Sequence, residues 1–94
     1  MKAILCKEFG PPERLVLEDI PSEAPAAGQV KVRVRAAGLN FPDVLIIKGE
    51  YQFKPSPPFS PGAEVAGDVV DVGAGVEGFR VGDRVIAMTG WNGF

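Results

Sequence analysis

The sequence contains no histidine and only one cysteine, Cys6. A lone cysteine cannot form a disulfide within the chain, and zinc sites built from Cys and His need more of these residues than are present. Imidazole bases and Ser-His-Asp triads are excluded for the same reason. We expect Cys6 to be a small buried residue of the first strand, and a reactive thiol is the alternative.

Long apolar runs and blocks of like charge are also missing. No segment approaches the roughly 20 apolar residues of a membrane-spanning helix, and the first residues become charged too early for a signal peptide. The formal net charge is −2, and Lys31, Arg33 and Arg35 alternate with valines as on the solvated face of a strand. These features argue against nucleic-acid and membrane partners and predict a cytoplasmic protein.

Turn-forming residues, in contrast, are abundant. The 94 residues include 12 glycines and 9 prolines, with 46% hydrophobic and 23% charged residues overall. We predict one small domain, residues 1–94, and a domain of this size buries only about 60 to 65% of the surface that its unfolded chain exposes. Many turns between short segments favour a mainly β fold.

Three segments in the first part of the chain have strand patterns. Residues 2–7 and 14–20 flank a Gly-Pro-Pro turn and should pair as a hairpin. Residues 29–36 alternate with a period of two, which predicts a strand with one buried and one solvated face. Residues 37–39 should end that strand.

A short α-helix is predicted between Asn40 and Gly49. Asn40 suits the N-cap, Pro42 suits the first turn where no amide donor is needed, and Asp43 can accept free amides there. Lys48 and Gly49 suit the other end of the helix.

A proline-rich loop then leads to an isolated carboxylate. Residues 50–60 contain three prolines, which cannot donate to a β ladder, so we expect a surface loop. Its apolar anchors are Tyr51, Phe53 and Phe59. Glu64 follows among small residues and precedes a valine-rich strand. A structural carboxylate, hydrogen-bonded or paired with an arginine, is favoured there over a catalytic acid.

Residues 73–78 spell Gly-x-Gly-x-x-Gly directly after this strand. A dinucleotide fingerprint needs a helix to begin here, so that backbone amides and the helix dipole meet the pyrophosphate. The following residues instead predict a turn at Gly82 and Asp83 and another strand, so we interpret the segment as a glycine-rich β connection. Residues 90–94 are an apolar, aromatic ending with no helix or strand to complete it, and we expect the chain to be cut in mid-fold.

Four motifs occur in a characteristic order. They are Val-Lys-Val-Arg-Val-Arg-Ala-Ala-Gly-Leu-Asn-Phe-Pro-Asp at 30–43, Gly-Glu-Tyr at 49–51, Pro-Gly-Ala-Glu-Val-Ala-Gly at 61–67 and Val-Gly-Asp-Arg-Val at 81–85. Together they resemble the amino-terminal catalytic domain of the medium-chain dehydrogenase/reductase superfamily, in its zinc-independent quinone oxidoreductase branch. The resemblance covers essentially the whole chain. It implies a mainly β (α+β), GroES-like partial β-barrel with one short helix.

Two positions indicate the zinc-independent branch. In the zinc-dependent alcohol dehydrogenases a cysteine follows the glycine that Gly38 matches, and a histidine lies between the residues that Gly62 and Glu64 match. Both bind the catalytic zinc. This chain has Leu39 and Ala63 at those positions, and neither offers a ligand atom. The resemblance therefore implies no metal site.

The resemblance also implies a reaction, namely hydride transfer from NADPH to a quinone, an enone or another conjugated carbonyl. The reaction would take place between this domain and a separate dinucleotide-binding domain that holds most of the NADPH. The full-length protein would be a homodimer, and this chain alone would be inactive. An enoyl-thioester reductase is the alternative within the enzymes. A co-chaperonin-like structural module, which shares the fold, is the alternative from another class.

Asn40 and Tyr51 match residues of the family's substrate cleft. They are the predicted catalytic residues, and Asn40 is also predicted to contact the cofactor. A second cleft tyrosine of some members corresponds to Leu45, which makes the cleft more apolar. Each predicted residue also has a structural interpretation: Asn40 as a helix cap whose amide nitrogen stays free for a ligand, and Tyr51 as a loop anchor with its hydroxyl in water.

Overall fold

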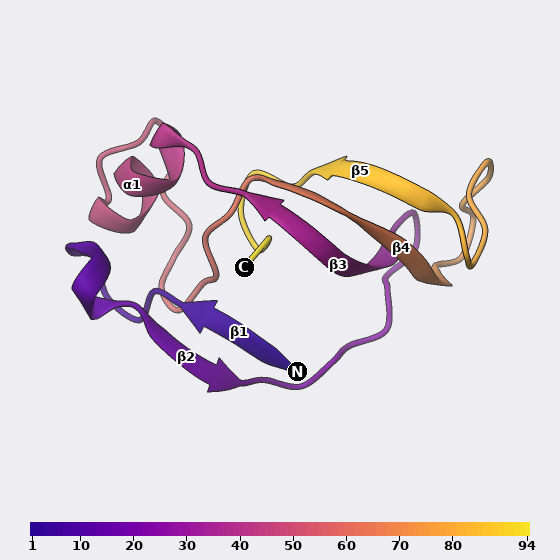
Figure 1. Cartoon of the computed structure of the whole chain (residues 1–94), viewed down its shortest axis with the longest axis horizontal. Helices are drawn as coiled ribbons and strands as arrows, with labels where there is room; N and C mark the ends of the chain where they lie inside the picture. The colour runs from indigo at the N-terminus through magenta and orange to yellow at the C-terminus, as the bar shows by residue number, and fades with distance from the viewer.

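A computed structural model describes all residues from 1 to 94. The chain is mostly β with one short α-helix, and its strands form two antiparallel sheets (Figure 1). One sheet contains β1 (Lys2–Leu5) and β2 (Val16–Asp19), and the other has the order β3 (Val30–Gly38), β4 (Glu64–Val72), β5 (Arg84–Met88). The helix α1 (Phe41–Lys48) follows β3, and a single 3-10 turn, η1 (Pro12–Arg14), precedes β2.

The predicted hairpin of β1 and β2 is confirmed, although both strands are shorter than expected and Arg14 belongs to η1. The two strands pair over their full lengths. β1 ends at Leu5 and not at Lys7, because Cys6 pairs with Phe59 of the proline-rich loop. The Cys6 amide donates to the Phe59 oxygen at 2.7 Å, and the Phe59 amide donates to the Cys6 oxygen at 3.1 Å. This bridge attaches the hairpin to the loop.

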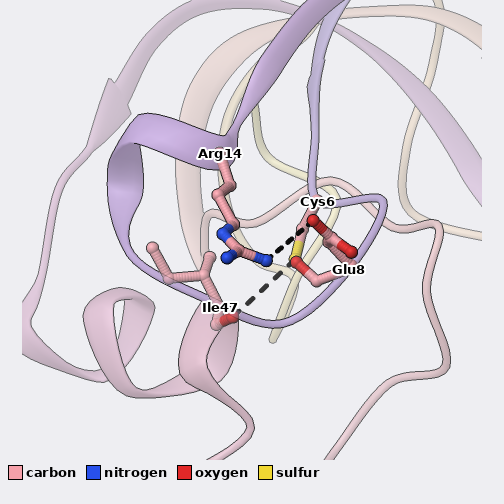
Figure 2. A network of polar contacts seen from close by, with 4 residues as sticks. All are labelled: Cys6, Glu8, Arg14 and Ile47. Carbon is pink, nitrogen blue, oxygen red and sulfur yellow. Dashed lines mark hydrogen bonds and ion pairs between the residues drawn. The ribbon is translucent and has the colours of Figure 1, made fainter.

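Cys6 also lies where the end of β1, the η1 turn and α1 meet (Figure 2). Its thiol donates to the backbone oxygens of Glu8, at 3.2 Å, and of Ile47, at 3.8 Å. Arg14 of η1 pairs with the Glu8 carboxylate at 2.8 Å. Cys6 is 1% exposed, so the predicted small buried residue is confirmed. Desolvation by burial raises the pKa of its thiol, against the lowering effect of the Glu8 backbone hydrogen bond.

β3 departs from its predicted pattern in two ways. It continues past residue 36 to Gly38, because Gly38 pairs with Glu64 of β4. Its register against β4 also shifts at two places. Each shift breaks the period of two along the strand. The strict alternation of buried and solvated side chains is therefore not found, and Val34 is 44% exposed.

The helix α1 follows its predicted start and stop residues. Asn40 is the N-cap, Pro42 lies in the first turn and Lys48 in the last. Gly49 ends the helix with a φ of 70°, a left-handed conformation that glycine adopts without steric cost. No helix in the structure is long and apolar enough to cross a membrane.

The glycine-rich segment after β4 is a β connection, as predicted. No helix follows residues 73–78, so the segment lacks the helix start that a dinucleotide fingerprint requires. The chain turns into β5 instead, and the Arg80 amide donates to the Asp83 carboxylate at 2.9 Å within that turn.

The core is small and lies beside α1. We call it the closed end, and its buried side chains are Cys6, Ile46, Ile47 and Phe59, with Leu15, Tyr51 and Trp91 packed against them. Between the β1–β2 hairpin and the three-stranded sheet lies an open cleft of about 810 Å³. Figure 1 shows this arrangement, with α1 at one end and the two sheets diverging from it.

Residues 90–94 form no helix or strand, as predicted, but their backbone makes hydrogen bonds to other segments. Three of their amides donate to residues 60–62 at 2.6 to 3.0 Å. The oxygen of Phe94 then accepts from the amide of Ile4 in β1 at 3.1 Å. This ending therefore links the proline-rich loop to the hairpin, a role that its sequence did not indicate.

Candidate functional site

The pairing of β3 with β4 creates the candidate site. Gly38 is the partner of Glu64, so residues 39–40, which leave β3, lie beside residues 62–63, which enter β4. The Glu64 side chain occupies the place that a Cβ at Gly38 would take, and a larger residue at position 38 would collide with it. We call residues 38–40 together with 62–64 the β3–β4 corner.

Leu39 and Ala63 bring hydrocarbon side chains to this corner. Leu39 is 77% exposed, and Ala63 is half-buried. No group of three or more His, Cys, Asp or Glu side chains that could hold a metal ion gathers anywhere in the structure. The corner thus offers apolar surface where a zinc-dependent relative would have ligands, and zinc-independent catalysis stays a prediction.

The structural interpretation of Glu64 is wrong in its detail. Glu64 forms no ion pair and no side-chain hydrogen bond within the chain. Arg35 of β3 binds a different carboxylate, that of Asp68, at 2.7 Å. Glu64 fills space over Gly38 and carries a charge that no cation of this chain matches.

Asn40 is held through its backbone by Asp43. The Asn40 amide donates to Oδ2 of Asp43 at 2.9 Å, and the Asp43 amide donates to the Asn40 oxygen at 3.1 Å. The two residues have the outline of a capping box, yet the Asn40 side chain makes no cap hydrogen bond of good geometry. Asn40 is exposed. Its position as N-cap is confirmed, and its side-chain nitrogen, which donates to no group of the chain, remains free for a ligand.

Tyr51 lies beyond the opposite end of α1 and packs against the closed end. Its ring meets that of Phe53 edge-on, with centroids 5.0 Å apart, and Phe53 lies 6.0 Å from Trp91. The loop-anchor role of Tyr51 is therefore present in the structure. No hydrogen bond joins Tyr51 to Asn40, so the two predicted catalytic residues flank α1 without a direct polar contact.

Sequence reasoning missed the burial of Asp43. This residue was expected only to accept amides in the first turn, but it is 3% exposed, and its Oδ1 has no hydrogen-bond partner. The Asn-x-x-Asp spacing could have indicated the bond to the Asn40 amide. Its burial depends on residues distant in sequence and left no local signal.

The fold and the corner agree with a known family. A model of the alcohol dehydrogenase GroES-like domain matches residues 26–93. The chain belongs to this family. Its fold is that of the quinone oxidoreductase-like amino-terminal domain in the medium-chain dehydrogenase/reductase superfamily, which confirms the predicted fold and favours the dehydrogenases over the co-chaperonin alternative.

Curated relatives of this GroES-like domain are several times longer. It is 44% identical over 93 residues to the quinone oxidoreductase-like protein 2 homolog of Nematostella vectensis, covering 98% of this chain and 25% of that protein. It is 43% identical over 90 residues to the quinone oxidoreductase of Rattus norvegicus, covering 95% and 27%. An alcohol dehydrogenase of a Moraxella species is 40% identical over 85 residues, covering 90% and 25%. The chain thus spans about a quarter of the length of these relatives.

Solved structures show the same domain. The human synaptic vesicle membrane protein VAT-1 homolog-like protein superposes with a TM-score of 0.92 at 37% identity, covering 98% of this chain and 30% of that one. Escherichia coli quinone oxidoreductase complexed with NADPH has a TM-score of 0.88 at 36% identity, covering 95% and 27%. The JamJ enoyl reductase has a TM-score of 0.84 at 25% identity, covering 99% and 30%.

Proposed function

We propose that this domain forms the substrate side of an NADPH-dependent oxidoreductase that transfers hydride to a quinone or another conjugated carbonyl. The β3–β4 corner is the observation that carries the proposal. It combines the free amide of Asn40 with hydrocarbon side chains at Leu39 and Ala63. Such a corner can bind an acceptor oxygen by hydrogen bonding. Its one carboxylate, Glu64, is not joined by enough further His, Cys, Asp or Glu side chains to hold a metal ion. The relatives named quinone oxidoreductase support the same acceptor class.

The chain's own residues fit only one end of the cofactor. The exposed amide of Asn40 can hydrogen-bond a nicotinamide carboxamide or an acceptor oxygen. The glycine-rich segment 73–78, however, has no helix start for a pyrophosphate. Most of the cofactor would therefore be held by another domain. NADPH, when bound, supplies the hydride, and the E. coli relative solved with NADPH supports this choice of cofactor.

In the proposed mechanism the chain binds and orients the acceptor. Negative charge develops on the acceptor oxygen during reduction, and a donor fixed in advance stabilises that charge. The Asn40 side-chain nitrogen is this donor, and the Tyr51 hydroxyl is a second one. Leu39 and Leu45 would keep water from the acceptor.

An enoyl-thioester reductase is the second candidate. The likeness to the JamJ enoyl reductase supports it, and so does Leu45, which removes a polar group from the expected cleft. Both reactions place hydride on a carbon conjugated to a carbonyl, so the same donor at Asn40 would serve either acceptor.

The test uses the complete protein with its dinucleotide-binding domain. NADPH oxidation is followed with menadione, a naphthoquinone, and with crotonyl-CoA, an enoyl thioester. A higher kcat/KM for menadione is expected, and the reverse order would favour the enoyl-thioester reductase. Absence of oxidation with both acceptors would contradict the proposal.

The role of Asn40 is tested by Asn40→Ala. Removing a single oxyanion donor is expected to lower kcat about 100-fold, while the affinity for NADPH stays nearly unchanged. Unchanged kcat would reduce Asn40 to a helix cap. Metal analysis and native mass measurement of the same preparation test the predicted absence of zinc and the predicted homodimer.

A further inference from the structure

Asp43 is a buried charged side chain that the proposed reaction does not use. It is 3% exposed and lies in the first turn of α1. One carboxylate oxygen, Oδ2, binds the Asn40 amide at 2.9 Å, whereas Oδ1 has no hydrogen-bond partner. Burying a carboxylate with an unpartnered oxygen destabilises a fold. A neutral side chain could accept a hydrogen bond from the Asn40 amide without this cost, so the presence of a carboxylate at position 43 needs an explanation.

The contacts of Asp43 provide that reason. Its carboxylate binds the N–H of Asn40, and its own amide binds the C=O of Asn40 at 3.1 Å. One residue therefore fixes both polar backbone groups of Asn40, which has an extended conformation with φ of −129° and ψ of 161°. The Asn40 side-chain oxygen faces the Asp43 amide in the capping-box arrangement but makes no cap hydrogen bond of good geometry. The Asn40 side-chain nitrogen makes no hydrogen bond within the chain.

The carboxylate of Asp43 makes this attachment firm. A hydrogen bond to a carboxylate is shorter and stronger than one to a neutral amide oxygen. The carboxylate also lies at the positive end of the α1 dipole. A neutral replacement could keep the geometry of the attachment but would hold Asn40 less firmly.

We propose that Asp43 is a positioning residue for Asn40. It fixes the Asn40 backbone at the β3–β4 corner and leaves the Asn40 side-chain nitrogen free to meet the acceptor oxygen. The inference rests on the proposed function, because it requires Asn40 to contact the substrate. Asp43 itself does not touch the acceptor, since it is buried.

If Asp43 had only a structural role, any substitution that destabilised α1 to the same extent would lower kcat by the same amount. Gly49 provides the matched control at the other end of the helix. It has a φ of 70°, and a Cβ there would lie 3.1 Å from the Phe9 ring. Gly49→Ala therefore strains the end of α1 while both Asp43 contacts to Asn40 remain.

The experiment measures Tm, kcat, KM for menadione and NADPH affinity in the complete protein. Asp43→Ala is expected to lower kcat about tenfold or more, with NADPH affinity changed less than about twofold. Each variant is assayed at the same number of degrees below its own Tm. Under these conditions Gly49→Ala is expected to retain the wild-type kcat. Asp43→Asn, which retains an acceptor oxygen but loses the charge, is expected to recover only part of the lost kcat.

A double-mutant cycle separates this inference from the proposed function. If Asp43 acts through Asn40, the Asn40→Ala/Asp43→Ala protein has the kcat of Asn40→Ala alone. If Asn40→Ala lowers kcat but Asp43→Ala lowers it no more than Gly49→Ala, the positioning role is wrong and the proposed function stands. If Asn40→Ala leaves kcat unchanged, the proposed role of Asn40 fails and the positioning role fails with it.

If the Asp43→Ala protein does not fold, Asp43→Glu tests the positioning role instead. It keeps the charge but moves the carboxylate by one methylene, so the Asn40 attachment is displaced. A loss of kcat with NADPH affinity retained is expected, and wild-type kcat would overturn the inference.

Discussion

The closed end and the outer face of β5 both carry large apolar side chains, yet they bury them very differently. Ile46 of α1 is 1% exposed, whereas Ile86 of β5 is 82% exposed. Met88, on the same face as Ile86, is 79% exposed. An apolar side chain stabilises the fold only when another segment covers it, so Ile46 contributes to the stability of this chain and Ile86 contributes little.

The difference follows from how many segments meet at each place. At the closed end, the end of β1, α1, the proline-rich loop and the tail at Trp91 converge. β5 pairs only with β4 and is an edge strand. The closed end also includes buried side chains of α1, whose N-cap is Asn40. The same buried side chains therefore stabilise the helix that positions this residue of the candidate site.

The largest expected effect comes from truncating one isoleucine in each region. Ile46→Ala should lower the free energy of unfolding by about 2 to 5 kcal/mol, because it leaves a cavity among buried side chains. Ile86→Ala should change it by less than about 0.5 kcal/mol, because the side chain is already in water. Urea denaturation of both variants measures the contrast. Equal losses would show that the β5 face is covered in solution.

A second pair of substitutions compares two glycines with left-handed backbone. Gly62 has a φ of 105°, and a Cβ there would lie 2.6 Å from the Phe94 ring, whereas Gly75 has a φ of 78° with open space around it. Both alanine variants strain the backbone, but only Gly62→Ala also displaces the tail. We expect Gly62→Ala to be less stable than Gly75→Ala by about 2 kcal/mol. Similar denaturation midpoints would mean that Phe94 does not pack on Gly62.

The thiol of Cys6 reports on the closed end through pH. Because burial raises its pKa in the folded state, the unfolded state releases this proton first as pH rises. The contribution of this thiol to the free energy of unfolding is therefore fully present below the ordinary thiol pKa. It is lost as pH rises through the raised pKa of the folded state. Denaturation midpoints should therefore fall more steeply with alkaline pH in the wild type than in Cys6→Ala.

Alkylation by iodoacetamide gives an independent measurement of the same thiol. The reaction of Cys6 should be slow in the folded chain and fast in urea, because only the thiolate of an accessible cysteine reacts. Fast alkylation of the folded chain at neutral pH would contradict a buried thiol.

The smallest expected effect lies on the exposed sheet face. Arg35 and Asp68 form an ion pair at 2.7 Å, with the arginine side chain 66% exposed. Arg35→Ala should lower the free energy of unfolding by less than about 1 kcal/mol, and added salt should reduce even this difference. A larger, salt-insensitive loss would show that this pair is shielded from solvent.

Local features of the chain were predictable because short-range physical chemistry sets them. The ends of α1 followed from Asn40 and Gly49, and the β1–β2 hairpin followed from apolar segments around a turn. The glycine-rich segment was recognised as a β connection because no helix pattern follows it. In each case neighbouring residues supply the hydrogen bonds or the backbone freedom that the structure needs.

Features that depend on distant partners were missed. The end of β3 depends on Glu64, which lies across the sheet from Gly38. Arg35 lies at a register shift and pairs with Asp68, whose Cα partner across the sheet is Arg33, so this ion pair depends on the register between β3 and β4. The role of the tail depends on residues 60–62 and on β1. No local pattern contains this information.

The sequence by itself determined the family, the element types and the hydrocarbon side chains at Leu39 and Ala63, because motif order and side-chain chemistry are properties of the chain alone. Only the tertiary structure decided that these positions meet at one corner. It also decided that Asp43 is buried while it binds the Asn40 amide, and that one apolar face is covered while another stays in water. Burial and strand register depend on contacts between segments far apart in sequence, and these contacts exist only once the chain has folded.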